Sequence, residues 1–202
     1  MRDLDRALAD IVAIRSQIAG GTTFRGYGPG TLAATGGLAL LTAGAQSLWL
    51  DEAAAPMTIL AGWIATALLS AGLIGADMLT RSRRLHSGLA DAMIRNAVAQ
   101  FVPAGAAGAL LLVVLARGAP DCLWLLPGLW QVLVGLGIFA AARSLPGAVA
   151  LAGAWYVVAG LAVLLLASET RALSPWAMGV PFAIGQGLVA VLIHRGGDDA
   201  EP

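Results

Sequence analysis

The residues of this chain that could do chemistry are few and widely separated. Two histidines, His86 and His194, show no metal-ligand spacing such as HxxxH. Cys122 is the single cysteine, which excludes an intramolecular disulfide and a cysteine-based metal cluster. No phosphate-binding loop, dinucleotide fingerprint or pair of catalytic carboxylates is present. The sequence therefore predicts a protein that is not an enzyme, with no catalytic residue, no metal and no cofactor.

Polar groups inside apolar stretches are the next candidates, because an ionisable or amide group is costly in hydrocarbon and marks function or packing. Asp77 is the only acidic residue within such a stretch, and Arg81 follows one helical turn later. This spacing predicts an i,i+4 ion pair rather than a proton-transfer site.

Two amides, Gln131 and Gln186, lie at similar depth on the fourth and sixth apolar runs. They are expected to make interhelical hydrogen bonds, including one to each other. The alternative is a shared cavity between these two runs, lined by Trp130, Gln131, Trp176 and Gln186.

A second set of candidates lies at the ends of the apolar runs. Arginine can hold a lipid phosphate, and tyrosine suits the headgroup zone. The residues predicted to contact lipid headgroups or a partner are Arg25, Tyr27, Arg81, Arg83, Arg84 and His86.

The elements that position these residues are long apolar helices. Hydrophobic residues make up 58% of the chain and charged residues 12%, about half of the usual ~25% of a soluble domain. Apolar blocks of about 20 residues match the ~30 Å hydrocarbon core of a bilayer. The fold class predicted is an all-α polytopic membrane protein, a bundle of six spans at Thr31–Leu50, Met57–Leu79, Phe101–Leu115, Leu123–Ala142, Gly147–Ser168 and Trp176–His194.

The ends of the chain complete this organisation. Residues 1–27 are predicted to hold a cytoplasmic amphipathic helix and a surface turn, residues 28–195 the six-span domain, and residues 196–202 a cytoplasmic tail. Residues 92–100 are expected to extend the short third span as an amphipathic lead-in that lies along the membrane. Stripes of small residues that suit close helix packing are Thr35, Ala39 and Ala43, Gly105 and Ala109, and Gly179, Ala183 and Gly187.

The distribution of arginine predicts how the chain is threaded. All twelve basic residues are arginine. With both termini cytoplasmic, only Arg117 and Arg171 lie outside, as the positive-inside rule requires. Trp49, Trp124 and Trp176 then fall near the outer interface. The predicted location is the bacterial inner membrane.

Three segments resemble an uncharacterised group of small six-span bacterial inner-membrane proteins. They are FRGYGPGTLAATG, RSRRLHSGLADAMI and LSPWAMGVPFAIGQ, and the resemblance covers most of the chain. It implies the six-span fold, and it implies no activity and no functional residues.

The function expected from these features is a non-enzymatic membrane module or accessory subunit. Its partners would be the bilayer and a cytoplasmic regulatory protein or another membrane subunit. The net charge of zero gives no electrostatic support to direct nucleic-acid binding. The alternative is a small transporter or ligand sensor that uses the cavity between spans four and six.

Overall fold

The structure is a computed structural model that describes residues 28–51, 54–85, 90–142 and 147–198, without the side chains of 82–85, 90–93, 96, 97 and 196–198. Within these ranges the chain is all helical, with no strand. The elements are α2 (Pro29–Trp49), α3 (Pro56–Leu85), α4 (Ala90–Gly118), the 3-10 helix η1 (Pro120–Leu125), α5 (Leu126–Ala141), the 3-10 turn η3 (Gly147–Val149), α6 (Ala150–Thr170) and α7 (Trp176–Asp198).

Five segments of the described residues are long and apolar enough to cross a membrane. They are Pro56–Arg81, Val98–Gly118, Pro120–Ala141, Gly147–Thr170 and Trp176–Arg195. The prediction of a helical membrane protein is confirmed at this level. Helix α2 is not among these five segments. Its 21 residues are enough to cross a membrane, but its threonines, glycines, Gln46 and Ser47 lower its mean hydropathy.

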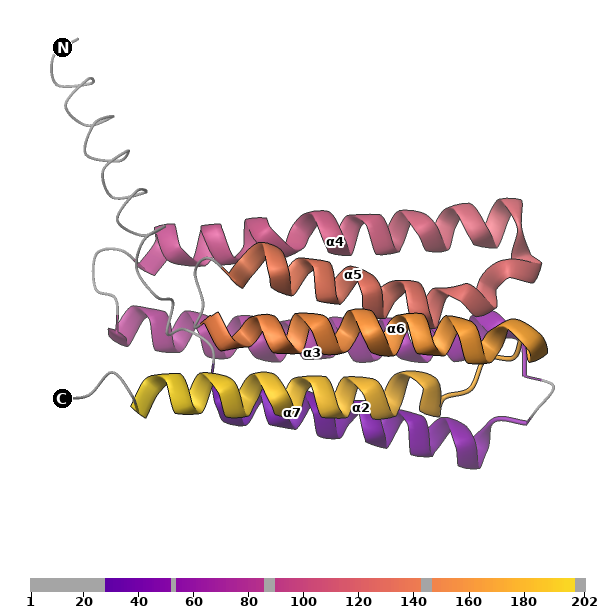
Figure 1. The fold of residues 1–202 in the computed structure, drawn as a ribbon, viewed down its shortest axis with the longest axis horizontal. Helices are drawn as coiled ribbons and strands as arrows, with labels where there is room; N and C mark the ends of the chain where they lie inside the picture. Colours follow the sequence, from indigo (N-terminus) through magenta and orange to yellow (C-terminus); the bar gives the residue numbers. More distant parts are fainter. Residues whose placement is uncertain (1–27, 52–53, 86–89, 143–146, 199–202) are drawn as a thin grey trace, which may run out of the picture.

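The six long helices form a ring in chain order (Figure 1). Each helix contacts the next one along the chain, and α2 closes the ring by packing along α7. Helix α5 also contacts α7 across the ring. Short connectors between antiparallel neighbours account for this order.

Helices α5 and α6 are held at close range by two glycine pairs. A Cβ atom on Gly160 would lie 2.6 Å from the Gly128 carbonyl oxygen, and one on Gly135 would lie 2.7 Å from the Gly153 carbonyl oxygen. Only glycine permits the two backbones to approach this closely. The glycine pairs therefore set the spacing of this helix pair.

Small residues also bring α2 against α7. A Cβ atom on Gly179 would meet the Ala43 methyl group at 2.5 Å, and one on Gly36 would meet the Ala183 carbonyl oxygen at 3.2 Å. Two of the predicted stripes are thus confirmed in part, because Thr35, Ala39 and Ala43 are buried at this contact.

Other members of the predicted stripes do not pack. Gly187 and Gly105 have open space where a side chain would project, and Ala109 is exposed. On α4, and at Gly187 of α7, the spacing of small residues therefore did not show which side of the helix packs against a neighbour.

Two helices continue beyond the predicted spans. Residues 92–100 extend the third span as predicted, since they belong to α4, which is one helix from Ala90 to Gly118 with Pro103 inside it. Helix α7 runs to Asp198, so residues 196–198 of the predicted tail are helical. The predicted amphipathic helix within residues 1–27 lies outside the described residues.

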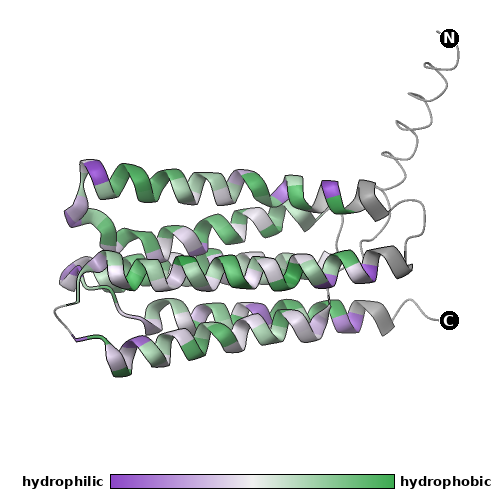
Figure 2. Ribbon diagram, turned by 180° about the vertical axis from the view of Figure 1, so that it is seen from behind, coloured by the Kyte–Doolittle hydropathy of each residue, from purple (hydrophilic) through white to green (hydrophobic). Residues whose placement is uncertain are grey.

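The apolar surface agrees with a lipid environment. Hydrophobic residues cover most of each helix, and hydrophilic residues gather toward the two ends (Figure 2). Leu68, Leu110 and Leu165 are among the leucines that point outward. Of the five apolar segments, those of α3 and α4 have the smallest share of buried residues.

Candidate functional site

A row of hydrogen bonds along α7 holds the neighbouring helices to its backbone. Gln131 Nε2 donates to the Ala177 carbonyl at 2.8 Å. Trp155 Nε1 donates to the Pro181 carbonyl at 3.0 Å, and the Tyr156 hydroxyl donates to the Phe182 carbonyl at 3.4 Å.

The first of these bonds has a specific cause. In a regular helix the Ala177 carbonyl would accept the N–H of residue 181, four positions on. Residue 181 is proline, which has no N–H. The fully buried Gln131 amide supplies the missing donor from α5.

Gln186 joins three helices at mid-depth. Its Nε2 donates to the Tyr156 hydroxyl of α6 at 3.2 Å, and its Oε1 lies 3.3 Å from the Thr35 hydroxyl of α2. Tyr156 is fully buried and its ring packs against Gly185. The Thr35 hydroxyl also lies 2.8 Å from the Leu32 carbonyl, so its one hydrogen is shared between Leu32 and Gln186.

A cavity of about 410 Å³ lies beside Gln186. It is enclosed by α2, α3, α4, α5, η3 and α7, and among the described residues Gln186 is the only polar side chain in its wall. The apolar wall comprises Leu32, Ala71, Ile74, Gly75, Met78, Val98, Phe101, Val102, Val134, Ile138, Val149, Val189 and Ile193. Its volume falls in the ~300–1,000 Å³ range of small-molecule sites.

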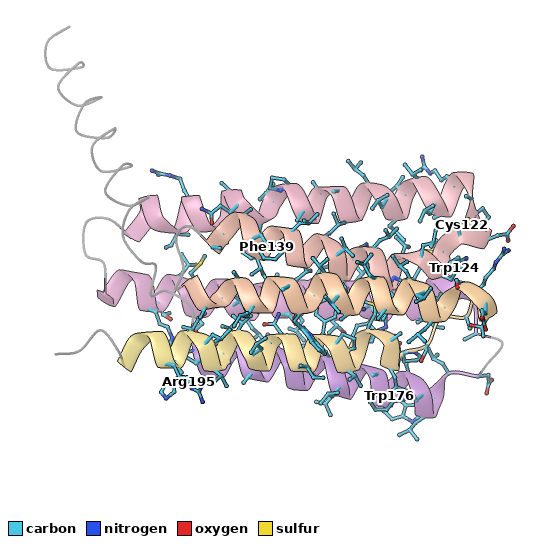
Figure 3. The ribbon with its side chains drawn as sticks, viewed as in Figure 1. Cys122, Trp124, Phe139, Trp176 and Arg195 are labelled. Carbon is cyan, nitrogen blue, oxygen red and sulfur yellow. The ribbon has the colours of Figure 1, made fainter. Side chains whose placement is uncertain are left out.

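The four residues predicted to line one cavity are not brought together. Trp130 Nε1 donates to the Gly108 carbonyl at 3.1 Å, and Gln131 is buried against α7. Trp176 is 46% exposed and lies at the end of the bundle opposite Arg195 (Figure 3). Of the four, Gln186 alone borders the cavity, and Gln131 and Gln186 bond other partners rather than each other.

The predicted ion pair is present at the end of α3. Arg81 Nε donates to Asp77 Oδ1 at 2.8 Å. Asp77 Oδ2 and the Arg81 guanidinium pack directly against Gly28, which leaves no room for a side chain there. Gly28 precedes the first turn of α2, where the helix dipole favours a carboxylate. The ion pair therefore packs against the residue that precedes α2, although Asp77 Oδ2 makes no hydrogen bond there.

The remaining predicted contact residues are described only in part. Arg25, Tyr27 and His86 lie outside the described residues. Arg83 and Arg84 are in the last turn of α3, and their side chains are not described. Arg95 of α4 and Arg195 of α7 are exposed near the same end of the bundle. Among the described residues no cluster of three metal-ligating side chains occurs.

Sequence reasoning missed the partners of both glutamines. The signal for Gln131 was present, because a proline within a helix leaves the carbonyl four residues earlier without a donor. Tyr156 and Thr35 gave no comparable signal, since their approach to Gln186 depends on which helices are neighbours.

Comparison with known proteins found no match. No protein-family model, no curated protein and no solved structure is similar to this chain.

Proposed function

We propose that this chain is a six-span inner-membrane protein of bacteria that acts as a non-enzymatic docking module for a cytoplasmic or membrane partner. Helix α2 is the sixth span, because Thr35 and Gln46 face inward and the exposed Ser47 donates to the Ala43 carbonyl of its own helix at 2.8 Å. Thr35 is 3% exposed and Gln46 is 8% exposed, and Gln46 donates to the Ile59 carbonyl of α3 at 2.9 Å. Lipid therefore meets chiefly the leucines of α2 rather than its polar groups.

Both termini are cytoplasmic in this proposal. Helices α2 and α7 have opposite directions, and the start of α2 and the end of α7 lie at the end of the bundle that carries Arg81, Arg95 and Arg195. The opposite end carries Asp51, Asp121 and Glu169 with Arg117 and Arg171. An excess of arginine at one end is the expected mark of the cytoplasmic side.

The native cysteine provides a direct test of this orientation. Cys122 is a free, partly exposed thiol in η1, at the end opposite Arg195 (Figure 3). A membrane-impermeant maleimide is expected to label it in intact spheroplasts. Thr80→Cys in a Cys122→Ser background is the control, and it should react only after the membrane is opened. Labelling of Thr80→Cys before opening would contradict the proposed threading.

The observation that carries the docking role is the unequal length of the helices at the two ends. At the basic end, α3 continues past its apolar segment to Leu85, and α4 begins at Ala90, well before its apolar segment starts at Val98. At the other end, α4 is followed almost at once by η1, and a few residues join α6 to α7. Among the described helices, α3 and α4 thus extend beyond their apolar segments at the basic end, where they offer a partner a surface outside the hydrocarbon.

Charge reversal of Arg83 and Arg84 tests the docking role. Replacing both with glutamate should lower recovery of co-purifying protein from native membranes by about tenfold, since charges at an interface steer and stabilise association. Quantitative mass spectrometry after mild detergent extraction measures the recovery. The matched control is glutamate at Arg117 and Arg171, at the opposite end.

Labelling of Cys122 serves as a readout that the charge-reversed chain keeps its orientation. An unchanged set of co-purifying proteins in the correctly threaded Arg83/Arg84 variant would remove the docking proposal.

A further inference from the structure

We propose that the cavity beside Gln186 binds one acyl chain of an anionic phospholipid, taken from the membrane leaflet at the arginine-rich end. This inference concerns a ligand site and is independent of the docking role. It rests on the polarity of the wall, the position of the opening and the charges beside the opening.

The wall offers little to a polar ligand. Gln186 is its single polar side chain among the described residues, and its amide already contacts Thr35 and Tyr156. A buried water needs about two to four polar partners, whereas the rest of this wall is apolar. An apolar occupant is therefore favoured over water or a polar solute.

The opening faces the hydrocarbon. Ala71 on α3, and Val98 and Val102 on α4, line the cavity and are also exposed on the outer surface of the bundle. These two helices pack sparsely against each other, whereas α5 packs closely on α6 and α2 on α7. The gap between α3 and α4 therefore connects the cavity with the region that lipid tails occupy.

Two arginines lie at this end of the cavity wall. Arg81 follows the lining residues Ile74 and Met78 at helical spacing on α3, with its guanidinium on the side of α2 against Gly28. Its Nε donates to Asp77, which leaves its terminal amino groups for a phosphate. Arg95 precedes Val98 and Val102 at helical spacing on α4. Both arginines are exposed, and guanidinium groups bind phosphate well.

The depth of the cavity suits a chain that enters from this end. On α3 the wall extends from Met78 to Ala71, which is roughly 10 Å along the helix axis. On α7 it extends from Ile193, near the arginine end, to Gln186 at mid-depth. A tail lying between α3 and α4 would end against the Gln186 network while its phosphate lies near Arg81 and Arg95.

Two glycines of α3 make a matched pair for the test. A Cβ atom on Gly75 would meet nothing within 4 Å, and Gly75 lines the cavity, so a leucine side chain there starts in open space and occupies part of the cavity. A Cβ atom on Gly72 also meets nothing within 4 Å, but Gly72 is exposed and does not line the cavity. Both substitutions replace glycine in the same helix, so their effects on helix propensity are alike.

The probe is phosphatidylglycerol with a photoreactive diazirine near the end of one acyl chain. The full-length protein is reconstituted in vesicles that contain it, and adducts are mapped by mass spectrometry. We expect adducts on interior residues such as Phe101 and Ile193 as well as on outward residues such as Leu110. Gly75→Leu should reduce the interior adducts about fivefold, equivalent to ~1 kcal/mol of affinity, whereas Gly72→Leu should not.

A second arm tests the headgroup. Interior labelling should fall when the probe is a phosphatidylcholine, and the preference for phosphatidylglycerol should disappear in Arg81→Gln/Arg95→Gln but persist in Arg117→Gln/Arg171→Gln. Equal labelling of the native protein by both lipids would overturn the proposed preference for an anionic headgroup. Interior adducts that persist in Gly75→Leu, or a non-lipid molecule found in the purified protein by native mass spectrometry, would overturn the acyl-chain site.

Discussion

Replacing Gly160 with leucine is expected to separate α5 from α6 and to destabilise the protein by more than about 3 kcal/mol, the upper part of the range for overpacked cores. The first atom of the new side chain would fall 2.6 Å from the Gly128 carbonyl oxygen and 3.0 Å from the Val132 nitrogen. These are backbone atoms, so they cannot move aside by changing a rotamer. The melting temperature in detergent, followed by tryptophan fluorescence, and the folded yield should both fall.

The control is the same substitution at Gly105 of α4. Gly105 is exposed, and a Cβ atom added to it would have nothing within 4 Å. Gly105→Leu should therefore leave stability unchanged or raise it slightly through helix propensity. A Gly160→Leu protein that melts no lower than Gly105→Leu would show that the close α5–α6 contact is absent.

Replacing Gln131 with leucine is expected to cost about 1 kcal/mol, because the Ala177 carbonyl then loses its side-chain donor, while removal of the unpartnered Gln131 Oε1 offsets part of that loss. The same change should cost much less in a Pro181→Ala background. Alanine restores the N–H that Ala177 would accept in a regular helix. The free energy of unfolding of the four proteins, measured with a denaturing detergent, gives the coupling energy directly.

Gln46→Leu provides the matched control for this cycle. Gln46 also donates to a helix carbonyl, that of Ile59, but no proline lies four residues beyond Ile59. The loss of unfolding free energy caused by Gln46→Leu should therefore be the same with proline or alanine at position 181. Equal costs of Gln131→Leu in both backgrounds would show that the glutamine does not replace the missing N–H.

The helices themselves could be predicted from the sequence because hydrocarbon thickness sets their length. The first run, expected at Thr31–Leu50, is α2 at Pro29–Trp49, and the fifth, expected at Gly147–Ser168, ends within two residues of α6. The ion pair of Asp77 and Arg81 could be predicted as well, since its geometry is local to one helix.

The contacts between helices could not be predicted, because they depend on how each helix is rotated about its axis. Helix α6 is apolar all round, so its sequence does not show that Gly153 and Gly160 face α5. On α4, Gly105 and Ala109 suggested a packing face that the structure leaves exposed. The cavity depends on six elements meeting at one end, which no periodicity in a single helix reveals.

The closure of the ring by α2 and α7 has a consequence for biogenesis. Helix α2 leaves the ribosome first of the six and is less apolar than the five spans that follow, yet its main packing partner is the last of them to be made. The hydrogen bond between Thr35 and Gln186 joins residues 151 positions apart. Contacts of such long range form late, so the inward face of α2 has no partner until α7 has been made. A chain truncated before α7 would display the Thr35 face without its partner helix.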